Sequence, residues 1–150
     1  MDQRPTQRVE TDVLVIGGGA TGLAAACTAA RSGASVLLVE RYGFCGGGAV
    51  AGLSGTICGL YEATENPVKP HQLVHGFVDD FIAQMESRGG LTEPLLYGKT
   101  FTRVHEPLAW RDAAPAVVGD NADLRWQPLD RIGELGLPAP VKKLLGNLTP

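Results

Sequence analysis

The sequence has few cysteines, few aromatic residues and no large excess of charge of either sign. Its three cysteines, Cys27, Cys45 and Cys58, are too few and too widely spaced for a disulfide framework or a zinc ribbon. Lysine and arginine total 13 against 16 aspartates and glutamates, which gives a net charge of -3. This mild negative balance argues against a nucleic-acid-binding surface, which needs a basic face.

Long apolar runs are also missing. Charged residues interrupt the N-terminus, so no secretory signal peptide is expected there. The most apolar stretch, residues 13–39, contains an arginine and several glycines and does not predict a membrane span. These absences predict a cytoplasmic protein that binds neither membrane nor nucleic acid. A length of 150 residues corresponds to about one domain.

The first forty residues contain a strand, a glycine turn, a helix and a second strand, in that order. The strands are expected at 12–16 and 35–39, and the alanine-rich helix between them ends at Ser32-Gly33. Because both strands are almost continuously apolar, we expect them to be central, parallel and covered on both faces. The pattern predicts a Rossmann-type βαβ unit of an α/β fold.

The glycines of the turn have the spacing of a dinucleotide-binding motif. Gly17, Gly19 and Gly22 match G-x-G-x-x-G, in which the glycines permit the turn, the approach of phosphate and close helix packing. The positive end of the helix then holds the pyrophosphate. Glu40 follows Gly22 by 18 residues, near the distance expected for an acid that binds ribose. A glycine-rich turn of another α/β unit would explain the glycines but not the position of Glu40.

A second glycine-dense segment follows at residues 43–55 and includes Gly46, Gly47 and Gly48. One interpretation is a mobile loop. The other is backbone that passes close to a ligand, where side chains would be in the way. Since the segment directly follows the ribose-binding acid, the second interpretation places it against the same nucleotide.

These motifs resemble the start of the FAD-dependent oxidoreductase family, a group of glutathione-reductase-like flavoproteins. The resemblance rests on the glycine turn at 12–22 and on the pattern Glu-Arg-x-Gly-x-x-Gly-Gly at 40–47. It is firm to about residue 62, fainter to about 114, and absent beyond. It implies FAD as the cofactor, with the following residues at the binding site: Gly17, Gly19, Ala20 and Thr21 at the pyrophosphate, Gly22 in the turn, Glu40 at the ribose, Arg41 near the adenine, and Gly46, Gly47 and Gly48 beside the pyrophosphate and ribityl chain.

The rest of the chain is less regular. Apolar residues at three- and four-residue spacing predict an amphipathic helix over 69–88, and a strand pair is expected around Gly98. A further helix begins near Pro107, and we expect Pro115 to end it. His71 and His75 have no evident third ligand, so no metal site is predicted. Cys45 has two interpretations, a thiol near the flavin or a small buried side chain.

The predicted organisation is a flexible leader at 1–11, the N-terminal portion of a Rossmann-type FAD-binding domain at 12–114, and an irregular, non-native or truncated tail at 115–150. The parallel sheet is expected to be incomplete, and no catalytic residue or substrate is identified. The favoured hypothesis is the FAD-binding portion of a truncated oxidoreductase, inactive in isolation. The alternatives are a non-catalytic FAD-binding subunit completed by a partner chain and an NAD-binding domain of another enzyme.

Overall fold

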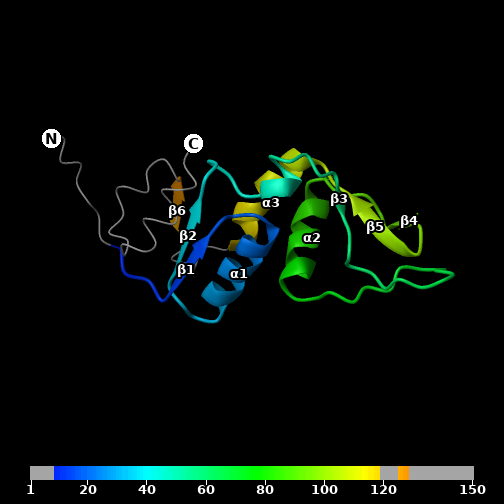
Figure 1. Ribbon diagram of the computed structural model, residues 1–150, viewed down its shortest axis with the longest axis horizontal. Helices are drawn as coiled ribbons and strands as arrows, with labels where there is room; N and C mark the ends of the chain where they lie inside the picture. Colours follow the sequence, from blue (N-terminus) through cyan, green and yellow to red (C-terminus); the bar gives the residue numbers. More distant parts are fainter. Residues whose placement is uncertain (1–8, 119–124, 129–150) are drawn as a thin grey trace.

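The computed structural model describes residues 9–118 and 125–128, which form two small sheets with three helices between them (Figure 1). The first sheet has the strand order β1 (Val13–Ile16), β2 (Val36–Glu40), β6 (Arg125–Pro128), and the second has the order β3 (Thr56–Ile57), β5 (Thr100–Val104), β4 (Leu95–Tyr97). Helices α1 (Ala20–Arg31) and α3 (Pro107–Val118) lie beside the first sheet, and α2 (Phe77–Ser87) lies toward the second (Figure 1). The fold is mixed α/β, as predicted.

The predicted βαβ unit is confirmed. Strands β1 (Val13–Ile16) and β2 (Val36–Glu40) pair in parallel, and α1 (Ala20–Arg31) connects them. The helix ends at Ser32, and Gly33 follows with φ of 90°. Strand β2 is buried throughout, whereas β1 is half-buried and forms an edge of the described sheet. The expectation of a central position is therefore correct only for β2.

A third strand of this sheet comes from the segment that we expected to be irregular. Strand β6 (Arg125–Pro128) pairs in parallel with β2, with Leu37 opposite Arg125. The prediction of an irregular tail is wrong for these four residues. A strand this short has little sequence signal of its own, and it is stabilised by pairing with β2, distant in sequence. Residues 129–150 lie outside the described part of the chain.

Pro115 does not end the third helix. Helix α3 (Pro107–Val118) continues past it, so that prediction is wrong. A proline inside a helix costs about 3 kcal/mol. Here Pro115 is exposed, while the opposite side of the helix buries Trp110, Ala114 and Val117 in the main core. Packing of that apolar side offsets the local penalty.

The predicted helix over 69–88 is shorter than its apolar periodicity suggested. Helix α2 (Phe77–Ser87) has Gly76 as its N-cap, and the φ of 88° at Gly76 is incompatible with a right-handed helix that continues from upstream. The Asp79 carboxylate accepts a hydrogen bond from the Gly76 amide at 2.8 Å and so caps the helix. Leu73 and Val74, which the pattern placed in the helix, are exposed. A strong local start signal therefore outweighed the periodicity upstream of it.

The predicted strand pair around Gly98 is confirmed. Strands β4 (Leu95–Tyr97) and β5 (Thr100–Val104) are antiparallel, and Gly98 has φ of 64° in the turn. Strand β3 (Thr56–Ile57) pairs with the other edge of β5. Arg103 of β5 is buried and forms a 2.7 Å ion pair with Glu86 of α2. This contact joins the second sheet to the helices.

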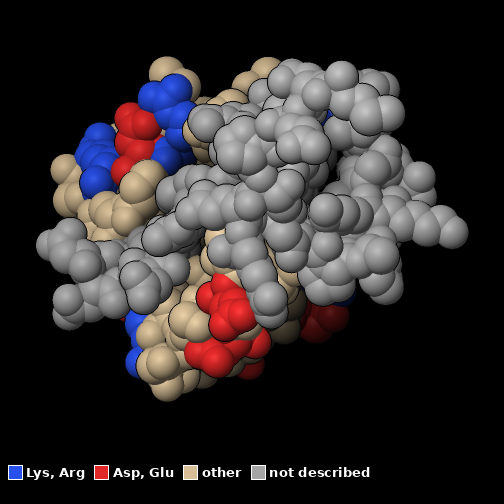
Figure 2. Space-filling model, turned by 90° about the vertical axis from the view of Figure 1, so that its left-hand side faces the viewer, with Lys and Arg blue, Asp and Glu red and all other residues tan. Residues whose placement is uncertain are grey.

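The described surface is mixed in charge. The face in Figure 2 carries basic and acidic side chains side by side in its described part. Within residues 9–118 and 125–128, no helix combines the length and apolar character needed to cross a bilayer. The same ranges contain no group of three or more His, Cys, Asp or Glu side chains arranged to hold a metal ion. His71 instead pairs with Glu62, and His75 with Asp79.

Candidate functional site

The backbone geometry of the turn requires glycine at two of its positions. Gly17 follows β1 with φ of 96°, a conformation that strongly favours glycine. A Cβ atom at Gly22 would lie 1.8 Å from the Gly17 carbonyl oxygen, closer than any side chain can approach. The first and third glycines of the motif are therefore structural, because they let α1 begin directly against the end of β1.

The middle glycine of the motif, Gly19, has a different environment. It is the N-cap of α1, its φ is -65° and its ψ is -179°, and no side chain in the described residues caps it. A Cβ atom there would meet nothing within 4 Å. Ala20 and Thr21 are exposed at the start of the helix. The N-terminus of α1 therefore has open space beside Gly19 and no capping side chain among the described residues, an arrangement suited to binding a phosphate group.

Glu40 lies under this turn and is buried. One carboxylate oxygen accepts a hydrogen bond from the Gly18 amide, and the other accepts one from the Tyr42 amide at 3.0 Å. Glu40 thus ties the end of β2 to the glycine turn. Arg41 is exposed, and its guanidinium lies 5.8 Å from the centre of the Tyr42 ring.

The second glycine segment lies against the first. The Gly46 amide donates a hydrogen bond to the Gly18 carbonyl at 2.9 Å. A Cβ at Gly47 would lie 3.2 Å from the Gly19 Cα, and Gly47 begins the short 3-10 helix η1 (Gly47–Ala49). Gly48 is exposed, with open space beside it. The second glycine segment is therefore backbone packed beside the turn.

Gly18 occupies a variable position of the G-x-G-x-x-G motif, but its surroundings in the fold leave no room for a side chain. A Cβ at Gly18 would lie 2.5 Å from the Cys45 sulfur and 3.0 Å from a Glu40 carboxylate oxygen. Burial and the nearby Glu40 carboxylate raise the pKa of the Cys45 thiol to about 12. Cys45 is thus a buried neutral thiol packed under the turn, which favours the structural interpretation of this residue. The run of three glycines was the available sequence signal for Gly18.

Comparison with protein families gives a match over residues 12–132 to the model of the FAD-dependent oxidoreductases. The chain belongs to this family. Members of this family bind FAD, so FAD is the cofactor of this chain. The match extends past residue 114, beyond which no resemblance was expected, and it includes α3 and β6.

No curated protein matches the sequence. Among solved structures, the chain is similar to Thermovibrio ammonificans THI4, with 20% identity and a TM-score of 0.46. The alignment covers 78% of this chain and 38% of that one. The chain thus spans less than half the length of this relative.

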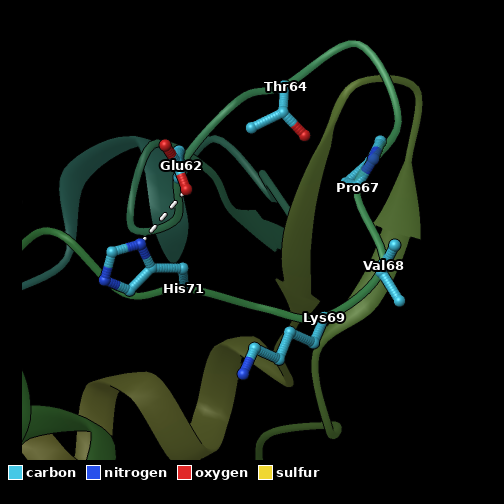
Figure 3. Close-up of a pocket in the computed structure, with 6 residues that line it drawn as sticks. All are labelled: Glu62, Thr64, Pro67, Val68, Lys69 and His71. Carbon is cyan, nitrogen blue, oxygen red and sulfur yellow. Dashed lines mark hydrogen bonds and ion pairs between the residues drawn. The ribbon is translucent and has the colours of Figure 1, made fainter.

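The described part of this FAD-dependent oxidoreductase family member contains several cavities, two of which are lined by residues singled out in the sequence, His71 in the first and Ala20 and Thr21 in the second. One, of about 370 Å³, is formed by the loop that contains Pro67, and the Glu62 and His71 side chains face each other beside it at 3.1 Å (Figure 3). The other, of about 520 Å³, borders the start of α1 at Ala20 and Thr21. The second cavity is the one next to the glycine turn, and it is absent from the sequence-based prediction because its walls come from distant segments.

Proposed function

We propose that the two glycine segments together hold the ADP part of FAD. The proposal rests above all on the open N-terminus of α1, where Gly19 leaves room for a phosphate and Gly47 closes the other side. In this arrangement the pyrophosphate lies at the amides of Gly19, Ala20 and Thr21. The preceding turn is formed by Gly17 and Gly22.

The remaining predicted contacts follow from this position of the pyrophosphate. Gly46, Gly47 and Gly48 would lie beside the pyrophosphate and the ribityl chain, where exposed Gly48 offers the most room. Arg41, exposed beyond β2, would lie near the adenine.

Glu40 is proposed to accept the ribose hydroxyl groups in addition to its backbone contacts. A carboxylate has about four lone-pair positions, and the Gly18 and Tyr42 amides account for two donors. The remaining positions can accept hydrogen bonds from a ribose. The backbone contacts also hold the carboxylate beside the turn, which reduces the entropy lost on binding.

The proposed activity is that of an FAD-dependent oxidoreductase with a substrate that we do not assign. The bound flavin supplies the redox chemistry, and the residues of this chain bind and orient the nucleotide end of the cofactor. A second arrangement with the same binding residues is a non-catalytic subunit whose FAD site a partner chain completes. An NAD-binding role is less well supported, because the family binds FAD.

A ligand series tests the proposal. The purified protein is titrated with FAD, ADP, FMN and NAD by calorimetry. FAD and ADP should compete for one site, since the proposed contacts are to the ADP part, and FMN, which lacks ADP, should not displace ADP. Tight NAD binding without FAD binding would refute the choice of cofactor. FAD binding that needs a co-purified chain would favour the subunit arrangement over the self-sufficient one.

A further inference from the structure

In the described part of the chain, strand β4 is an edge of the second sheet and carries only exposed apolar or aromatic side chains. It pairs with β5 on one side, and it lies at the end of the molecule away from the first sheet (Figure 1). The exposed fraction is 47% for Leu95, 57% for Leu96 and 74% for Tyr97. An edge of this kind offers both backbone groups and apolar side chains to a further strand.

The backbone groups of Leu96 are directed away from β5. Gly98 and Lys99 form a two-residue turn between Tyr97 and Thr100, which are paired. Such a turn directs the Tyr97 carbonyl toward the Thr100 amide, and so toward β5. Because successive residues of an antiparallel strand direct their backbone groups to opposite sides, the Leu96 amide and carbonyl point outward from the edge of the sheet.

This edge is complementary to a second copy of itself. When two β4 strands pair antiparallel with Leu96 opposite Leu96, the amide of each Leu96 faces the Leu96 carbonyl of the second copy. Leu95 of each copy then lies opposite Tyr97 of the other, because both are one residue from Leu96. Cross-strand pairs of an aliphatic and an aromatic side chain stabilise a sheet.

The charges on either side of the strand fit the same register. Glu93 and Lys99 are equally far in sequence from Leu96, so antiparallel pairing places each Glu93 opposite Lys99 of the second copy. Lys99 already forms a 2.6 Å ion pair with Glu65 of its own chain, but its side chain is 64% exposed and is open to a second carboxylate. This charge complementarity favours a second copy as the strand that covers the edge.

We propose that the protein forms a symmetric dimer in which two β4 strands pair antiparallel about Leu96 and join the two second sheets into one. Stable interfaces bury about 1,200–2,000 Å² in total. Strand β4 has three residues, and Pro94 before it has no amide hydrogen to extend the pairing. The dimer is therefore weak, with a Kd in the micromolar to millimolar range. The inference is independent of the proposed function, because β4 shares no residue with the proposed FAD contacts.

A cysteine in the middle of β4 tests the pairing. Opposite residues of an antiparallel pair have Cα atoms about 4.5–5.5 Å apart, which a disulfide can span. Cys58 is the exposed native cysteine, whereas Cys27 and Cys45 are buried, so the variants are made in a Cys58→Ser background. On mild oxidation, Leu96→Cys should form covalent dimers about tenfold faster than the matched control Leu108→Cys, since pairing raises the effective thiol concentration. Leu108, on α3, is 56% exposed, close to the value for Leu96.

Two further variants in that background test the register. In Leu95→Cys alone or Tyr97→Cys alone, the two thiols of a dimer are diagonal neighbours about 7–8 Å apart. A mixture of the two variants brings the thiols directly opposite each other, so it should form mixed disulfides faster than either variant alone. Mass spectrometry of the linked peptides measures this. Equal rates for Leu96→Cys and Leu108→Cys, no advantage of the mixture, or a link from position 96 to a different co-purified protein would overturn the proposal.

The unmodified protein provides a test without cysteine chemistry. Sedimentation equilibrium over micromolar to millimolar concentrations should show a monomer–dimer equilibrium. Leu96→Lys places two ammonium groups opposite each other and should abolish the dimer, whereas Leu108→Lys should retain it. Both positions are exposed, so urea unfolding should find both variants about as stable as the unmodified protein. A protein that stays monomeric, or one that dimerises equally well with Leu96→Lys, would refute the pairing through β4.

Discussion

Replacing Gly19 with valine should separate cofactor binding from folding. The backbone at Gly19 has φ of -65° and ψ of -179°, which valine adopts without strain. Its Cβ would meet no atom within 4 Å. The main folding cost is that valine is a poor N-cap, which amounts to about 1 kcal/mol. Urea unfolding should therefore show a folded variant of only slightly lower stability.

The Gly19→Val substitution should cost much more binding free energy for the cofactor than it costs folding stability. The valine side chain would occupy the space where we propose that the pyrophosphate meets the first amides of α1. Hydrogen bonds to a charged group contribute about 1.5–3 kcal/mol each. Loss of two of them corresponds to a decrease in affinity of roughly 100-fold to 10,000-fold, at about 1.4 kcal/mol for each factor of ten. Calorimetric titration with ADP and with FAD measures this directly.

The matched control is Gly43→Val. Gly43 is exposed, its Cβ position is also open, and it has no assigned contact with the cofactor. The Gly43→Val variant should bind ADP with the same affinity as the unmodified protein. The reasoning is refuted if folded Gly19→Val binds ADP within threefold of the unmodified protein. It is also refuted if that variant loses more than about 3 kcal/mol of stability, because the space at Gly19 would then not be open.

Three further outcomes follow from the structure. Gly22→Ala should lower the free energy of unfolding by more than about 2 kcal/mol, because its Cβ would lie 1.8 Å from the Gly17 carbonyl oxygen; urea denaturation measures this. Pro115→Ala should raise the melting temperature, since alanine restores an amide that can donate to the Arg111 carbonyl in α3. Raising the pH from 9 toward 12 should lower stability more steeply in the unmodified protein than in Cys45→Ala. The folded-state pKa of this thiol is about 12 against 9.0 as the ordinary value, so its contribution is complete below pH 9 and is lost as the pH rises.

Each of these three predictions has a result that would contradict it. A Gly22→Ala protein as stable as the parent would mean that the turn relaxes without cost. A lower melting temperature for Pro115→Ala would mean that the proline contributes to packing after all. For Cys45, the difference in slope should reach at most about 1.4 kcal/mol per pH unit. Parallel pH profiles would show that the thiol is not buried as described.

Local rules predicted the parts of the fold that local backbone geometry controls. Gly17 and Gly33 have φ values that strongly favour glycine, so the turn before α1 and the end of that helix were readable from the sequence. The same is true of Gly98 between β4 and β5. Where two local signals conflicted, the stronger one decided the outcome. Gly76 and the capping Asp79 set the start of α2 against an apolar periodicity that began earlier.

Such local rules could not predict contacts between segments that lie far apart in the sequence. The extension of α3 past Pro115 depends on the core that Trp110 and Val117 enter, and β6 depends on pairing with the edge of β2 that β1 leaves unpaired. Neither requirement is visible in the residues of those segments alone. A proline penalty of about 3 kcal/mol is small compared with the burial of several apolar side chains.

The candidate site also has one part that the sequence predicted and another that depends on the tertiary structure. The sequence by itself determined a glycine turn before a helix, an acid after the second strand and a second glycine segment. Only the tertiary structure decided that Gly46 donates to the Gly18 carbonyl, that Glu40 holds the same turn, and that His105 borders a cavity beside it. The physical reason is the separation in sequence of the residues that take part. A backbone angle is specified by one residue, whereas a hydrogen bond or a cavity wall exists only once folding has brought together residues that lie far apart in the chain.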